Sequence, residues 1–149
     1  MKTNANNLFL ANRLVSLLKQ RPPFLLVECI TSYIPYKAIQ GKKSFSSDDI
    51  WSGLALVSQN KNIPLFLLIE TLGQLSEILI RASFKEVETK TGILVAVNKM
   101  DVLDNVECGD IMEIESVLEN RFKNLYATRT VAFNSKGAII KAALVHTFK

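Results

Sequence analysis

The sequence predicts an α+β fold in which one antiparallel sheet wraps a single long apolar helix. Residues 63–83 carry a long helical pattern whose first half is almost continuously apolar, so this helix needs cover on all sides. Strand-like segments with turn residues between them follow this helix, and two more precede it. No helical segment separates the later strands, which does not fit a doubly wound parallel sheet.

Length and composition are those of one globular domain. The chain has 149 residues, of which 48% are hydrophobic and 21% are charged. A chain of this size buries a substantial core without disulfides or structural metals. We therefore expect a single domain over residues 1–149.

Several classes of protein do not fit the sequence. No apolar run approaches the roughly 18 residues of a membrane span, and Arg13 interrupts the apolar stretch near the amino terminus, which carries no cleavage pattern of a signal peptide. Cys29 and Cys108 lie far apart and His146 is the only histidine, so we expect no metal site and no cofactor. A reduced, cytoplasmic protein is the expectation.

The net charge of +4 is mild, and its lysines and arginines are scattered along the chain. Nucleic acid binding would need a denser basic stripe with interleaved aromatic residues, so no nucleic acid partner is expected. A weakly basic surface suits an acidic protein partner, and it also suits plain solvation.

Four segments are expected before the long helix. Leucines at helical spacing predict a helix over 7–19, which stops before Pro22. The residues over 23–34 are rich in Val, Ile, Phe and Tyr and predict a strand, and 36–45 predict a second one. A long polar loop is expected over 46–62.

The long helix is expected to begin near Asn62, a good capping residue, with Pro64 in its first turn. It runs to about Ser83 with Gly73 as a weak helix former inside it. Four strands are expected after it, over 92–103, 110–120, 125–133 and 138–148.

One face of this helix carries the first candidate for chemistry. Helical spacing places four polar side chains on that face: Glu70, Gln74, Glu77 and Arg81. In one interpretation, these four residues form the solvated stripe of an amphipathic helix. In the other, Glu70 lies at the boundary between an apolar and a polar surface and transfers protons. In the second case, free N–H groups near Leu65 and Phe66 would accept charge on a thioester oxygen.

Three segments resemble the hot-dog fold 3-hydroxyacyl-acyl carrier protein dehydratases: "RPPFLLVECI", "IPLFLLIETLGQ" and "ECGDIMEIESVLENRF". The residues in register are Phe24, Leu25, Leu26, Val27, Pro64, Glu70, Leu72, Gln74, Gly109 and Asp110. The resemblance covers nearly the whole chain in element order and implies a hot-dog fold. It also implies that Glu70 is catalytic and that Pro64, Leu65, Phe66 and Gln74 bind substrate.

The same resemblance implies a departure in the acid–base machinery. The family pairs its helix glutamate with a histidine in a His-Phe-Pro-Gly loop, and that motif is absent from this chain. The histidine position falls near Leu56, and Leu65 replaces the glycine that follows the helix proline. The chain is identified as a divergent member that lacks the catalytic histidine, so its dehydratase activity is expected to be impaired or to depend on a partner, unless Asp48 or Asp49 assists from the loop.

Two other functions stay open. The first is an acyl thioesterase in which Glu70 is a general base or a nucleophile. The second is a binding or structural subunit without chemistry. The expected ligand is a thioester of acyl carrier protein or of coenzyme A. Because a wrapped sheet leaves an edge strand to be paired, we expect a homodimer or a heterodimer with a histidine-bearing homologue.

Overall fold

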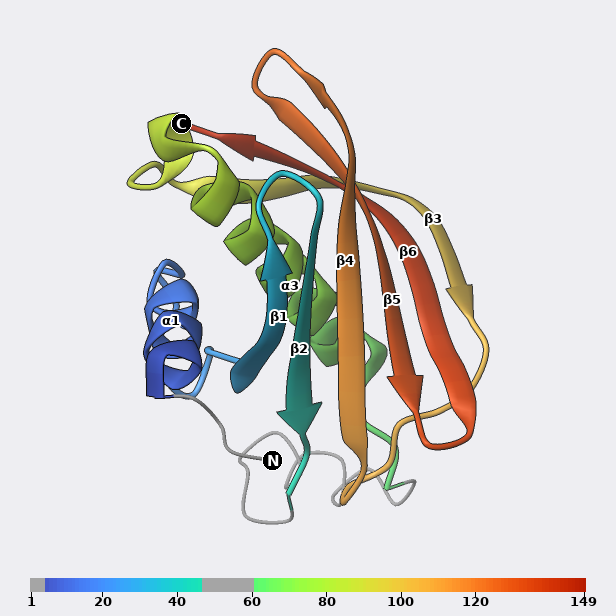
Figure 1. Ribbon diagram of the computed structural model, residues 1–149. Coiled ribbons are helices and arrows are strands. Elements are labelled where there is room, and N and C mark those ends of the chain that lie inside the picture. The colour runs from blue at the N-terminus through green and yellow to red at the C-terminus, as the bar shows by residue number, and fades with distance from the viewer. Residues whose placement is uncertain (1–4, 47–60) are drawn as a thin grey trace.

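The computed structural model describes residues 5–46 and 61–149, and the predicted Leu56, Asp48 and Asp49 lie outside them. One six-stranded antiparallel sheet curves around a long helix that crosses one face of it (Figure 1). The strand order is β1-β2-β4-β5-β6-β3. The predicted α+β architecture, a hot-dog fold with one wrapped helix, is confirmed.

The helices are α1 (Ala5–Val15), α3 (Leu65–Ser83) and a short 3₁₀ turn, η1 (Lys85–Val87). The strands are β1 (Cys29–Ile34), β2 (Ala38–Ser44), β3 (Gly92–Val102), β4 (Ile111–Phe122), β5 (Leu125–Asn134) and β6 (Gly137–Phe148). The four strands expected after the long helix are therefore present, each within about two residues of its expected bounds.

The long helix α3 is buried along most of its length. Fourteen of its 19 residues are buried, and its aliphatic side chains pack against the inner face of β2, β4, β5 and β6. Removal of this much apolar surface from water is the main free-energy gain that holds the helix in the sheet. α3 ends where Phe84 turns to an extended conformation while its N–H still bonds to the Ile80 carbonyl oxygen.

Two local expectations were wrong. Asn62 does not cap α3: Pro64 occupies the capping position, and Asn62 forms an isolated bridge with Glu107 instead. The first predicted strand begins only at Cys29, because the Leu26 N–H bonds to the side-chain oxygen of Gln74 and not to a neighbouring strand. Leu26 is nevertheless buried, as its apolar character predicts.

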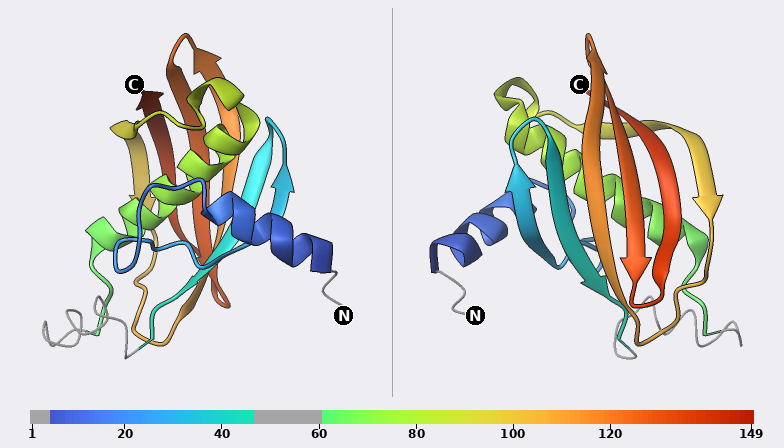
Figure 2. Two further views of the ribbon diagram at one scale, coloured as in Figure 1. Left: turned by 90° about the vertical axis from the view of Figure 1, so that its left-hand side faces the viewer. Right: turned by 45° about the vertical axis from the view of Figure 1, so that its right-hand side comes forward.

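The two edges of the sheet differ (Figure 2). α1 packs beside the short edge strand β1, whereas no element of the described chain pairs with the outer side of β3. β3 exposes Val95, Val97 and Val102, which are 49%, 39% and 49% exposed. A long edge strand with exposed branched apolar residues is a typical surface for pairing with another sheet.

A small polar cluster lies inside the apolar core between α3 and the sheet. The hydroxyl groups of Ser76, Ser116 and Thr130 lie within 2.8–2.9 Å of one another, and Ser76 also donates to the Leu72 carbonyl oxygen. These three side chains are fully buried. Because each hydroxyl has a partner, the cluster ties the helix to β4 and β5 without leaving a buried polar group unpaired.

Candidate active site

Glu70 lies on α3 less than two turns after the helix begins, and it is exposed. Its Oε1 accepts a hydrogen bond of 2.8 Å from Nε2 of Gln74, one turn further along. The carboxylate is therefore held at the surface by a neighbour on its own helix, and no other described side chain donates a hydrogen bond to it.

Gln74 is 1% exposed, and its amide is fully used. Nε2 donates to Glu70 Oε1 and to the Phe24 carbonyl oxygen, both at 2.8 Å, and Oε1 accepts from the Leu26 N–H at 2.8 Å. Both amide protons and the oxygen thus have partners. Gln74 connects the Glu70 carboxylate to the segment that precedes β1.

The start of α3 presents backbone N–H groups next to exposed apolar side chains. Pro64 precedes the helix, and Leu65 and Phe66 are 40% and 61% exposed. In the part of the chain that the structure describes, no acceptor is bound to the N–H of Leu65 or Phe66, whereas the Leu67 N–H bonds to the Pro64 carbonyl oxygen. Unpaired N–H groups at a helix start favour negative charge on a ligand oxygen.

The hypothesis of a solvated stripe along α3 is wrong beyond Glu70. Gln74, Glu77 and Arg81 are 1%, 7% and 1% exposed. Arg81 donates from Nε and Nη2 to Glu77 Oε1 at 2.8 and 2.6 Å, and from Nη1 to the Val87 and Glu88 carbonyl oxygens. The polar residues on this face are therefore a buried, internally paired row, and only Glu70 reaches solvent.

His146 lies on β6 and is 1% exposed. It packs against Gly73: a Cβ added there would lie 3.9 Å from His146 Nε2. Burial lowers the pKa of His146 to about 4, while a hydrogen bond to the Gly73 backbone opposes that shift. His146 Nδ1 is buried without a partner in the described chain. The imidazole is thus neutral at physiological pH.

The structure brings four of the predicted site residues to the first half of α3 or its start, and Gln74 to the next turn. It does not bring His146 to them: no hydrogen bond or ion pair between described residues joins His146 to Glu70. Sequence reasoning missed the Phe24–Leu26 backbone as the partner of Gln74. A single sequence gives no sign of that contact, because the two segments lie 48–50 residues apart along the chain.

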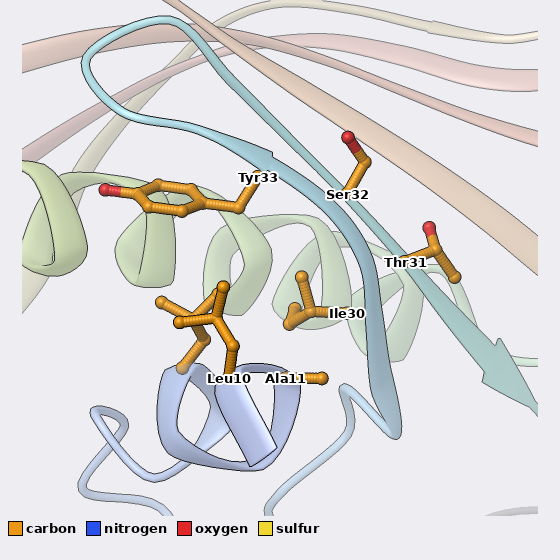
Figure 3. A pocket seen from close by; sticks show the side chains of 7 residues that line it. Leu10, Ala11, Ile30, Thr31, Ser32 and Tyr33 are labelled. Atoms are coloured by element: carbon orange, nitrogen blue, oxygen red, sulfur yellow. The ribbon is translucent and has the colours of Figure 1, made fainter. Parts of the chain in front are cut away.

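A hollow of about 260 Å³ lies between α1 and β1 (Figure 3). Leu10 and Ala11 face it from α1, and Ile30 and Tyr33 from β1. None of the predicted site residues lines it. In residues 5–46 and 61–149, no cluster of His, Cys, Asp or Glu side chains is placed to hold a metal ion, and no helix has the length and apolarity to cross a bilayer.

No family model matches the chain. Among curated proteins it is similar to the 3-hydroxyacyl-[acyl-carrier-protein] dehydratase FabZ of Rickettsia typhi, with 27% identity over 114 residues, which cover 76% of this chain and 77% of that enzyme. The predicted resemblance to these dehydratases is thus supported at the level of sequence similarity.

Solved structures share the fold at low sequence identity. The dehydratase heterocomplex ApeI:P from Xenorhabdus doucetiae superposes with a TM-score of 0.76 and 14% identity, over 91% of this chain and 90% of that one. A hypothetical thioesterase protein with coenzyme A from Streptococcus pneumoniae gives 0.61 and 11%, over 80% and 84%. At these identities the likeness establishes the hot-dog fold and nothing further.

Proposed function

We propose that this chain handles acyl thioesters and acts as one subunit of a dehydratase for 3-hydroxyacyl thioesters. Its contribution is the Glu70 carboxylate, and the second proton carrier comes from a partner chain. The proposal rests on one observation: the chain does not bring a histidine to the Glu70 carboxylate. Glu70 is held at the surface by Gln74, whereas the only histidine of the chain is buried against Gly73.

The proposed reaction is the elimination of water from a 3-hydroxyacyl thioester. One group removes the proton from the carbon next to the thioester carbonyl, and the electrons form the new double bond as the hydroxyl leaves. The other group protonates that hydroxyl, so that water and a 2-enoyl thioester are released. Glu70 supplies one of these two proton transfers.

The start of α3 is suited to the charge that develops on the thioester oxygen. The N–H groups of Leu65 and Phe66 are unpaired in the described chain, and the positive end of the helix dipole adds to them. The exposed side chains of Leu65 and Phe66, with Pro64 before them, offer an apolar surface for the acyl chain.

The relatives support this choice of reaction and of assembly. The similar Rickettsia typhi protein is a 3-hydroxyacyl-[acyl-carrier-protein] dehydratase, and the fold neighbour from Xenorhabdus doucetiae is a dehydratase heterocomplex. We therefore propose an acyl carrier protein thioester as the substrate, a coenzyme A thioester as the alternative, and a cytoplasmic location.

A thioesterase is the second candidate. The fold neighbour from Streptococcus pneumoniae is a hypothetical thioesterase protein solved with coenzyme A. In hydrolysis Glu70 would activate a water molecule or attack the carbonyl carbon itself, and neither role needs a histidine. A subunit that only binds remains the third candidate.

The test is co-expression of this chain with a histidine-bearing homologue from the same source. The co-purified complex is assayed with 3-hydroxyacyl and acyl thioesters, with and without Glu70→Gln. We expect little dehydration by this chain alone, activity in the mixed complex, and a loss of roughly 10²- to 10⁴-fold in the variant complex.

Other outcomes choose between the candidates. Robust dehydration by the chain alone contradicts dependence on a partner. Hydrolysis of acyl thioesters that is lost in Glu70→Gln supports the thioesterase. If the mixed complex is equally active with and without Glu70→Gln, this chain acts only as a scaffold.

A further inference from the structure

The β4–β5 hairpin extends beyond the rest of the sheet at one end of the molecule (Figure 1 and Figure 2). β2 pairs with β4 only as far as Val117, after which the Leu118 N–H bonds to the Lys37 carbonyl oxygen at 2.9 Å. Residues 119–122 of β4 therefore continue past the end of β2, and among the described strands only β5 pairs with them. The tip of this hairpin, residues 121–125, is thus a projecting surface.

Apolar side chains are exposed at this tip. Phe122 and Leu125 are partners in the register of the hairpin, so their side chains lie on the same face of it. They are 66% and 39% exposed, and no large apolar residue of the described chain is more exposed than Phe122. Exposed apolar surface costs free energy in water, which burial in a partner would recover.

Arg121 anchors the tip to the body of the protein. Its guanidinium lies over the rings of Phe84 and Tyr126, at 4.8 and 5.2 Å, and its Nη2 pairs with Glu86 at 2.9 Å. Because Arg121 is the register partner of the buried Tyr126, these contacts are on the inner face of the sheet. The apolar pair, one residue further on, therefore faces outward, away from the core.

Two lysines add positive charge near the apolar pair. Lys123 follows Phe122 in the hairpin turn, and its Nζ lies 5.5 Å from the centre of the Phe122 ring. Lys37 lies in the adjacent β1–β2 turn, after Tyr36, which is 61% exposed and packs its ring on Phe84 at 5.1 Å. Both lysines are exposed, and neither forms an ion pair with a described residue. This end of the molecule thus combines exposed rings with uncompensated cations.

An anionic lipid surface fits this combination better than a folded protein does. A stable protein interface buries about 800 Å² on each partner, which is more than the tip of one hairpin offers. A bilayer needs no complementary shape to receive a projecting side chain. Its interface accepts aromatic and aliphatic groups, and its anionic headgroups attract nearby lysines.

We propose that the tip of the β4–β5 hairpin docks the protein reversibly on an anionic lipid surface. Phe122 and Leu125 enter the headgroup region, and Lys123 and Lys37 contact the lipid phosphates. The inference does not depend on the proposed reaction. The tip is anchored on Phe84, directly after the end of α3, whereas Glu70 lies near the start of that helix, so docking leaves Glu70 accessible.

The test is flotation of the purified full chain with vesicles made of equal parts phosphatidylglycerol and phosphatidylcholine, compared with vesicles of phosphatidylcholine alone. We expect the protein to partition at least about tenfold more strongly onto the anionic vesicles, because each lysine near an anionic surface contributes about fivefold. About 1 M salt should remove this difference, since it screens charges beyond a few ångströms.

Phe122→Ser/Lys123→Gln should weaken partitioning onto the anionic vesicles at least about tenfold. The matched control Ile111→Ser/Lys136→Gln makes the same two chemical changes at exposed residues near the other end of the sheet, and it should leave partitioning unchanged. Phe122→Trp keeps a large apolar ring at the tip and should retain binding. Its fluorescence emission should shift to shorter wavelength on anionic vesicles, relative to the wild-type chain.

Three outcomes would overturn the inference. The wild-type chain does not float with anionic vesicles, which leaves the tip to a soluble partner. The tip variant and the control lose binding equally, which means that the contact is not specific to the tip. The protein binds but the emission of Phe122→Trp does not shift, which means that another surface meets the lipid. No turnover is measured, so failure of the proposed reaction leaves this result unchanged.

Discussion

The amide of Gln74 joins the candidate site to the interior of the protein. It is buried, both of its protons and its oxygen are bonded, and one of its partners is the carboxylate proposed to transfer a proton. The Glu70 carboxylate is therefore oriented by a side chain that cannot move without breaking bonds to the Phe24–Leu26 backbone. This makes Gln74 a positioning residue in the proposed site.

Gln74→Met should lower the free energy of unfolding by about 1–3 kcal/mol, because it leaves the buried Leu26 N–H without its acceptor. Glu70→Gln should change it by no more than about 0.5 kcal/mol, since Glu70 is exposed and the new amide oxygen still accepts from Gln74. Urea denaturation of both variants measures the difference. Equal stabilities would show that the Gln74 bonds contribute nothing to folding.

His146 should make the fold sensitive to acid. Its pKa falls from 6.5 to about 4 on folding, mainly through burial, so below pH 6.5 the unfolded chain binds a proton that the folded chain does not. The free energy of unfolding should therefore fall as the pH drops from about 6.5 to 4, by up to roughly 3 kcal/mol from this residue, and then level off.

The measurement is the free energy of unfolding against pH for wild type and His146→Gln, whose amide keeps a donor for the Gly73 carbonyl. The difference between the two curves isolates the histidine from the carboxylates that titrate in the same range. Parallel curves between pH 6.5 and 4 would contradict a buried neutral imidazole.

At the scale of elements, the sequence predicted the order and type of the segments well because apolar periodicity is a local signal. The long helix and the four strands after it are each encoded by their own residues. The strand from Pro23 to Glu28 was overpredicted because the competing partner of Leu26 is a side chain 48 residues away. The burial of Glu77 and Arg81 was missed for the same reason, since periodicity places both on a face but does not say what covers it.

Gly73 and Gly41 should respond oppositely to alanine. A Cβ at Gly73 would meet Leu94 Cδ2 at 3.7 Å and His146 Nε2 at 3.9 Å, ordinary contact distances inside a helix. A Cβ at Gly41 would lie 2.8 Å from the Cys29 carbonyl oxygen and 3.0 Å from Leu75 Cδ1. Gly73→Ala should therefore stabilise by about 0.5–1 kcal/mol and Gly41→Ala destabilise by about 1–3 kcal/mol.

Thermal and urea unfolding of the two variants test this pair. Destabilisation by Gly73→Ala would mean that the close packing of α3 on Leu94 and His146 does not accept even one methyl group.

At the scale of the molecule, the bare β3 edge should pair with a second sheet. Val95 and Val97 are exposed on this 11-residue edge strand, and pairing with the edge of a second sheet would bury them. Light scattering at micromolar concentration should give at least a dimer for the purified chain. A monomer at that concentration would count against the proposal.

Val97→Lys should shift this equilibrium toward the monomer, because pairing would bury its charge. Ile111→Lys makes the same chemical change at a 59% exposed position on β4, a strand inside the sheet, and should leave the assembly unchanged. Loss of the dimer in both variants would indicate general disruption and would remove the assignment of the interface to β3.

The unequal edges of the sheet set the stoichiometry of any assembly. Among the described residues α1 packs beside β1 and no element packs beside β3, so two sheets that join at β3 would leave α1 next to each outer edge and hinder growth into filaments. On the proposed function, a copy of itself and a histidine-bearing partner then compete for one edge. The yield of competent enzyme would peak when the cell makes the two chains in equal numbers, and an excess of this chain would lock itself into inactive pairs. The activity would thus depend on the ratio of the two chains, because both bind at the β3 edge.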